Sequence, residues 1–105
     1  MENKDNHFLG LRTVGYAVNE LGKARDWYAE RSTIAAVGFL EELELAIRAI
    51  SLAPDLYPEY VDGTRRYVFP RFPFNLVYRV GAESILIIAV SHQRREPRYW
   101  ASRAE

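Results

Sequence analysis

The spacing of apolar residues predicts two helices in the first half of the chain. Apolar side chains recur every three or four residues from Ala17 to about Arg31, and again between Ser32 and Pro54. Ser32 can cap the start of the second helix, and Pro54 ends it because proline cannot continue the backbone hydrogen bonds. The apolar stripe predicted for this helix consists of Val37, Leu40, Leu43, Ile47 and Ile50, with Glu41, Glu42 and Glu44 mostly on its outer side. The short connection predicts an antiparallel hairpin, in which each helix buries the stripe of the other.

The remaining apolar segments have the length and composition of β-strands. A short first strand is expected between Leu9 and Tyr16, and two more at Thr64–Phe69 and Phe74–Val80. The run Ile85–Ser91 is apolar on both faces, which is typical of a central strand. This order predicts an α+β domain with an N-terminal strand, a two-helix hairpin and a three-stranded antiparallel meander. The strands should form one twisted sheet, covered on one face by the helices.

The composition limits the chemistry that the chain can perform. Its 105 residues suit one domain, 1–105, in which residues 1–8 and with them His7 are expected to be frayed. The absence of cysteine excludes disulfides, thiolate zinc sites and cysteine nucleophiles. No phosphate-binding loop, paired acid–base motif or metal-ligand cluster is found, so neither a cofactor nor a metal is expected. Without a membrane-length apolar segment or a secretory signal, we expect a cytoplasmic protein.

The net charge is zero, but the charges are unevenly distributed. Residues 1–61 hold ten acidic residues against six Lys or Arg, whereas residues 62–105 hold four acidic residues against eight Arg. Arginine suits bidentate contact with carboxylates and phosphates, so the second half predicts an anionic partner, either a nucleic acid or an acidic protein. The alternative is that these arginines only solvate the sheet and its edge.

Four segments together resemble a known family. The runs GTRRYVFPRFPFNLVYRV and ILIIAVSHQRREPRYW are similar to ParE-like members of the RelE/ParE toxin superfamily, and ELGKARDWYAER and GFLEELELAIRAI fit the same family. The likeness extends from about Arg12 to Trp100. It implies the toxin of a type II toxin–antitoxin system, held inactive by a ParD-like antitoxin of the ribbon-helix-helix type.

The superfamily contains two kinds of toxin that share a fold and differ in target. The ParE branch implies growth inhibition through protein contact with DNA gyrase and no reaction by the toxin, as in plasmid stabilisation systems. The RelE branch implies cleavage of mRNA on the ribosome. A third alternative is a decayed toxin that only binds its antitoxin.

A nuclease of the RelE type would need a base, an acid and cations around one phosphate. By resemblance, Tyr99 matches the C-terminal tyrosine of those enzymes, and Arg66 replaces a strand lysine. Val68 and Asn75, however, stand where a second lysine and an arginine are expected, which favours the ParE branch. His92 is the best candidate for proton transfer because histidine is the usual general acid or base near neutral pH, although a histidine at a strand end can equally bond the neighbouring backbone. The candidate nuclease residues are His92, Tyr99, Arg66, Arg94 and Arg95.

A binding surface is expected where the meander and the C-terminal segment meet. Neighbouring strands could bring the arginines of both segments to one basic face for gyrase, RNA or an acidic antitoxin tail. The predicted target- or antitoxin-binding residues are Arg65, Arg66, Arg71, His92, Arg94, Arg95, Arg98, Tyr99 and Trp100. Large aromatics near element ends are more often core than anchors, so Trp27 and Trp100 are expected to be buried. The helix hairpin is also expected to leave apolar residues exposed for an antitoxin helix.

Overall fold

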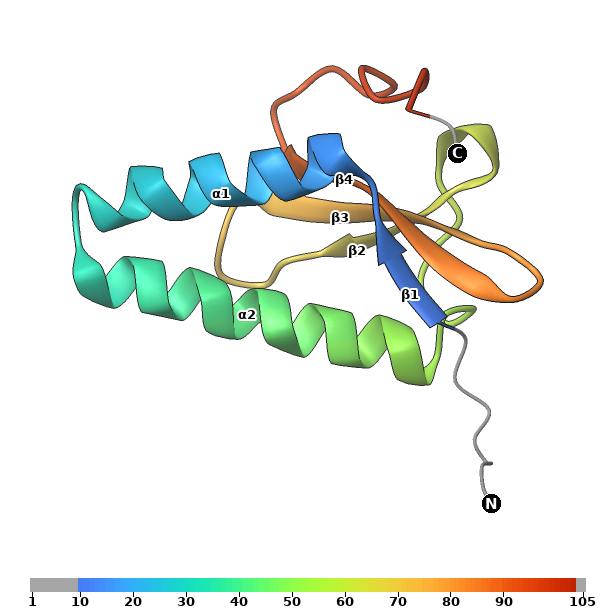
Figure 1. Cartoon of the computed structure of the whole chain (residues 1–105), viewed down its shortest axis with the longest axis horizontal. Coiled ribbons are helices and arrows are strands. Elements are labelled where there is room, and N and C mark those ends of the chain that lie inside the picture. The colour runs from blue at the N-terminus through green and yellow to red at the C-terminus, as the bar shows by residue number, and fades with distance from the viewer. Residues whose placement is uncertain (1–9, 104–105) are drawn as a thin grey trace.

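The computed structural model describes residues 10–103, which fold into two helices and a four-stranded sheet (Figure 1). The elements are β1 (Gly10–Thr13), α1 (Gly15–Ala29), α2 (Thr33–Leu52), the 3-10 turn η1 (Val61–Gly63), β2 (Arg65–Val68), β3 (Phe74–Val80) and β4 (Ser84–His92). The strand order is β1-β4-β3-β2, in which β1 runs parallel to β4 and the other pairs are antiparallel. The predicted α+β fold is therefore confirmed. The expected fraying of residues 1–8 and the position of Leu9 lie outside the described residues.

The helix hairpin has the local signals that the sequence predicted. The Ser32 Oγ accepts a hydrogen bond of 3.1 Å from the backbone N–H of Ala35, which satisfies one of the free donors at the start of α2. The helix ends at Leu52, and Ala53 leaves the helical conformation with ψ 70°. This residue precedes Pro54, whose ring disfavours the helical conformation in its neighbour.

The buried face of α2 is only partly the predicted one. Leu43 and Ile50 are buried as expected, but Val37 and Leu40 are 49% and 38% exposed. The buried positions of α2 are Ala36, Phe39, Glu42, Leu43, Ala46 and Ile50. Because this helix carries apolar residues around most of its circumference, spacing alone allowed several orientations, and small alanines permit the close approach to the sheet.

The prediction that Glu42 lies on the outer side of α2 was wrong. Glu42 is 2% exposed, and its carboxylate accepts hydrogen bonds from the backbone N–H of Arg71 at 2.8 Å and from its Nε at 2.6 Å. A buried carboxylate is tolerated when it is paired and hydrogen-bonded. The pair fastens the β2–β3 connection to α2.

The sheet has a core on each face, and β4 contributes to both. The first core lies between the sheet and the helices, and includes Phe39, Leu76 and Ile85. The second lies on the opposite face, where Trp100 covers Ile88 and its neighbours. Residues Ile85–Ser91 are all buried, which confirms the predicted central strand.

The edge of β4 beyond β1 is covered by side chains. β1 pairs with β4 only along Ser84–Ile87. Farther along, the backbone N–H of Val90 donates to the Glu20 Oε1 at 3.0 Å, and the backbone oxygen of Ile88 accepts from the Arg103 Nη1 at 3.3 Å. Two charged side chains thus take the hydrogen-bonding positions of a further strand at this edge.

Candidate functional site

The segment 93–103 carries most of the predicted site residues across the second face of the sheet. Figure 1 shows it on the side of α1 that faces away from α2. Trp100, 2% exposed, anchors the segment, which confirms the prediction that this side chain is core. The turn leading into it places Arg98 in the left-handed region with φ 82°.

Glu20 on α1 fastens this segment to the rest of the molecule. Its carboxylate accepts from the Tyr99 hydroxyl at 2.6 Å and from both terminal nitrogens of Arg103 at 2.9 and 3.0 Å. Burial, followed by the hydrogen bond to Glu20, raises the pKa of Tyr99. Burial by itself would lower the pKa of Arg103, but the hydrogen bond and charge of Glu20 raise it. Neither Glu20 nor Arg103 belongs to a motif, so their sequence positions gave no sign of this role.

A pocket of about 480 Å³ lies beside this cluster. Its apolar lining comes mainly from α1 and the start of β3, including Ala24, Trp27 and Phe74. His92 and Arg95 also line it, as does Tyr99. The pocket therefore brings three of the predicted site residues together.

The His92 imidazole is held by the backbone that follows it. Its Nδ1 accepts from the Arg94 N–H at 3.1 Å, and its ring meets that of Phe74 edge-on at 5.3 Å. This is the structural role that the sequence analysis left open for a strand-end histidine. Since His92 pairs with Phe74, a member of the first core, it lies on the helix-covered face of the sheet.

Arg66 lies on the other face. It pairs in register with Val77, which belongs to the second core, and its guanidinium lies 4.5 Å from the centroid of the Tyr60 ring. Asn75 projects to the same face as Val77 because it lies two residues away on the same strand. Asn75 is 7% exposed, and its Oδ1 has no hydrogen-bond partner among residues 10–103.

The structure brings only part of the expected basic face together: Arg66 and Arg98 both contact residues 60–62, whereas Arg65 and Arg71 are held elsewhere. Arg65 donates to the Tyr57 backbone oxygen at 2.6 Å and lies near Asp55 and Glu59 at the β2 edge. Arg71 is bound to Glu42 of α2, on the face opposite Arg66.

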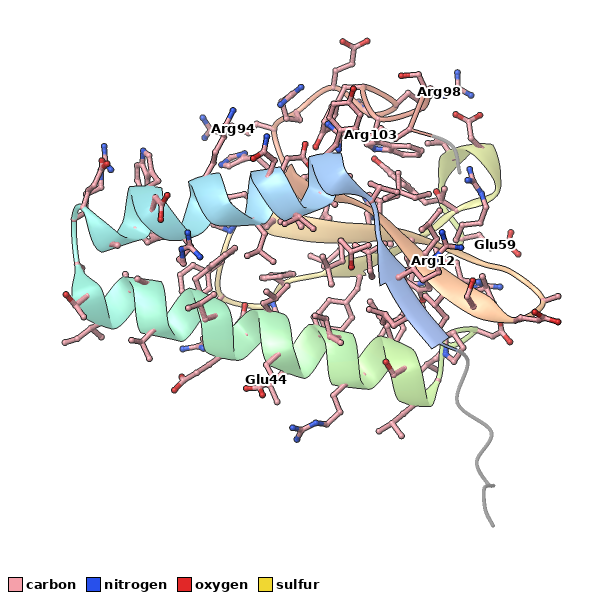
Figure 2. The ribbon with its side chains drawn as sticks, viewed as in Figure 1. Arg12, Glu44, Glu59, Arg94, Arg98 and Arg103 are labelled. Carbon is pink, nitrogen blue, oxygen red and sulfur yellow. The ribbon has the colours of Figure 1, made fainter. Side chains whose placement is uncertain are left out.

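The arginines of the C-terminal segment also have different partners. Arg98 pairs with Asp62 of η1 at 3.0 Å, whereas Arg95 stacks on the Tyr99 ring at 3.7 Å. In Figure 2, Arg94 stands over α1, and Arg98 lies at the far end of the segment.

The prediction that Trp27 is core was also wrong. Its side chain is 52% exposed at the rim of the pocket, and Arg31 lies 3.8 Å from its ring centroid. Tyr28, the next residue, packs against Phe39 and Phe74 and fills the core position instead. Two adjacent aromatics on a helix point about 100° apart, so only one of them faces the core.

Residues 14–97 match the family model described as the ParE toxin of the type II toxin–antitoxin system, parDE. The chain belongs to the ParE toxin family. A solved structure described as the chromosomal ParDE toxin–antitoxin system from P. aeruginosa is similar in fold, with a TM-score of 0.70 and 19% sequence identity. The match covers 80% of this chain and 95% of that one. No curated protein matches the chain.

Two further findings concern this ParE-family chain. No helix within residues 10–103 combines the length and apolar composition that a bilayer crossing requires. The same residues hold no group of three or more His, Asp or Glu side chains placed to bind a metal ion.

Proposed function

We propose that this ParE-family toxin acts in the cytoplasm by binding and inhibiting DNA gyrase, and that a ParD-like ribbon-helix-helix antitoxin neutralises it. The observation that carries the proposal is that the candidate nuclease residues do not form one complete set, although His92, Arg95 and Tyr99 line the same pocket. His92 lies on the helix-covered face, whereas Arg66 lies on the opposite face. Arg66 therefore cannot act with His92 on the same phosphate.

The state of Tyr99 supports the same conclusion. Its hydroxyl proton is directed at the Glu20 carboxylate at 2.6 Å, and its ring is covered by the Arg95 guanidinium. A hydroxyl held in this way serves the structure and is not free to protonate a leaving oxygen. Val68 and Asn75, which replace the expected cations, lie side by side in register, so neither position supplies a charge beside Arg66.

The outer face of α2 offers a surface for an antitoxin helix. Ile34, Leu45 and Leu52 are 85%, 55% and 65% exposed. They are separated by eleven and seven residues, about three and two helical turns, and so share one face. An exposed apolar stripe of this kind suits the apolar side of a partner helix. Glu41 and Arg48 are also exposed and fall on this face between the apolar residues, and Figure 2 shows Glu44 directed away from the sheet on the same helix.

The target is tested by measuring gyrase supercoiling with purified toxin. We expect the wild type to block supercoiling or to trap cleaved DNA, and His92→Ala to do so equally because the imidazole performs no reaction. Full gyrase activity at saturating toxin would contradict the proposal. Codon-positioned mRNA cuts in a translating extract that disappear in His92→Ala would establish the ribosome-dependent nuclease instead.

Neutralisation is tested separately in cells. Expression of the toxin alone should arrest growth, and the product of an adjacent ribbon-helix-helix gene should restore it. Harmless expression of the toxin would indicate the decayed form. Leu45→Glu should retain growth arrest and lose rescue, because a carboxylate in the middle of the apolar stripe opposes burial of a partner helix.

A further inference from the structure

The pocket beside Glu20 has the walls of an anchor site for one large apolar side chain. Trp27, Tyr28 and Phe74 form its aromatic walls, and the buried Ala24 and Val90 also line it. Its volume of about 480 Å³ lies within the range of roughly 300 to 1,000 Å³ found for ligand sites. It belongs to neither the outer face of α2 nor the second face of the sheet, since its residues come from α1, β3, β4 and the C-terminal segment.

The pocket is cationic at its rim. Lys23 and Arg95 line it, and no carboxylate among the described residues lies within ion-pair distance of either. The acidic member of the lining, Glu20, is already neutralised by Arg103 at 2.9 Å. An occupant should therefore carry negative charge around its apolar part.

The aromatic rings favour a peptide over a nucleic acid base. Bases bind single-strand sites by stacking on open ring faces. Here Arg31 lies on the Trp27 ring at 3.8 Å, and Arg95 lies on the Tyr99 ring at 3.7 Å. The Tyr28 ring is enclosed by Trp27, Phe39, Phe72 and Phe74. Rings whose faces are covered in this way present mainly their edges, which can pack against an aliphatic or aromatic side chain.

We propose that this pocket receives one large apolar side chain from a carboxylate-rich segment of the antitoxin, with Lys23 and Arg95 contacting the flanking carboxylates. The inference rests on the proposed toxin–antitoxin function and adds a second contact to the one on the outer face of α2. The acidic segment would reach the pocket while the antitoxin helix occupies that face. A partner that contacts two separated surfaces gains affinity from both, because the second contact forms within a complex that the first already holds together.

The two tryptophans allow occupancy to be measured directly. Trp27 is 52% exposed at the pocket rim and Trp100 is 2% exposed in the second core, so a soluble quencher reports almost only on Trp27. The probe is a synthetic peptide with one phenylalanine between glutamates and aspartates. We expect it to protect Trp27 from the quencher, whereas a peptide with alanine in place of phenylalanine, and one with lysines in place of the acids, should not.

Charge-reversal variants test whether the peptide binds at the pocket or elsewhere on α1. Lys23→Glu combined with Arg95→Glu should abolish the protection, and Arg25→Glu, an exposed charge reversal outside the pocket on the same helix, should preserve it. If Arg95→Glu perturbs the fold by removing the stacking of Arg95 on Tyr99, the single variant Lys23→Glu replaces the double variant in this test. No protection by the acidic phenylalanine peptide would overturn the proposal. Stronger protection by a single-stranded oligonucleotide than by the peptide would overturn it in favour of a nucleic acid site.

Titration with a ribbon-helix-helix protein encoded beside the toxin gene tests whether the antitoxin uses the pocket. The charge-reversed double variant should bind it on the order of tenfold more weakly than wild type, with Arg25→Glu unchanged. Equal binding by both variants would refute the pocket and leave the toxin–antitoxin pairing intact. Absence of binding to the wild-type toxin would refute the proposed function itself, and the pocket proposal with it.

Discussion

Replacing Glu20 by glutamine should destabilise the protein far more than the loss of one charge at the surface. Each carboxylate oxygen accepts two donors: Val90 N–H and the Arg103 Nη1 meet Oε1, while the Tyr99 hydroxyl and the Arg103 Nη2 meet Oε2. An amide has only one acceptor oxygen, so whichever way it is oriented its NH₂ group faces two donors. The variant thus leaves an arginine that is only 13% exposed without its counter-charge.

The expected cost follows from this burial. Breaking a buried pair by removing one partner costs about 3 to 5 kcal/mol, and the remaining solvent contact of Glu20 and Arg103 reduces this to roughly 2 to 4 kcal/mol. With a urea dependence of about 1 to 2 kcal/mol per molar, a loss of 3 kcal/mol lowers the midpoint by roughly 1.5 to 3 M. The assay is urea denaturation followed by circular dichroism.

A matched control and a double-mutant cycle make the test specific. Asp62→Asn removes a pair of similar length, 3.0 Å to Arg98, with side chains 39% and 61% exposed, and should cost less than about 1 kcal/mol. Glu20→Gln combined with Arg103→Met should be less destabilising than the sum of the two single variants. A Glu20→Gln midpoint no lower than that of Asp62→Asn, or additive losses in the cycle, would refute the reasoning.

Three further predictions concern other parts of the fold. Ser32→Ala should lower the free energy of unfolding by about 1 kcal/mol through loss of the cap on α2, and Ser32→Gly by only a few tenths, which thermal denaturation can resolve; equal losses would contradict the capping role. Glu42→Ala should cost about 2 to 3 kcal/mol and speed amide exchange at Arg71, whose N–H loses its acceptor; unchanged exchange would show that the loop is held by other contacts. Burial, opposed by Arg65, raises the pKa of Tyr78 from 10.0 to about 12, so its contribution to stability is complete below pH 10 and is lost as the pH rises towards 12. Tyr78→Phe should lower the free energy of unfolding by about 1 kcal/mol at neutral pH, because the hydrogen bond to the Pro54 backbone oxygen is lost. Its denaturation midpoint should also fall less steeply above pH 10 than that of the wild type. An equally steep fall would contradict the assignment.

The sequence predicted the elements well because their signals are local. Helical spacing, the Ser32 cap and the two-sided apolar run at Ile85–Ser91 each act within a few neighbouring residues, and all three were confirmed. The orientation of α2 was less predictable. A helix with apolar residues on most sides can bury apolar surface in several orientations. Steric fit against the sheet decides which orientation is adopted.

The arrangement of charged residues could not be predicted from spacing. The Glu42–Arg71 and Glu20–Arg103 pairs join residues far apart in the chain, and no motif marks either pair. The expected basic face is incomplete for the same reason, because Arg71 and Arg98 pair with carboxylates that only the tertiary fold brings near them. His92, in contrast, bonds the backbone two residues away, an interaction local enough for sequence reasoning to anticipate.

The pairing of β1 with β4 has a consequence for the order of folding. The β2–β3–β4 meander connects neighbours in sequence, whereas β1 lies 74 residues from its partners on β4 (Gly10 against Ser84). Arg103 is held at the same β4 edge by Glu20, 83 residues away. Contacts between distant residues carry the greater entropic cost of loop closure and form late. We therefore expect a folding intermediate whose β4 edge is still open, and chains stopped after Trp100 should resemble it. Faster amide exchange at Val90 than at Leu76 in such chains would support this order, and equal protection would argue against it.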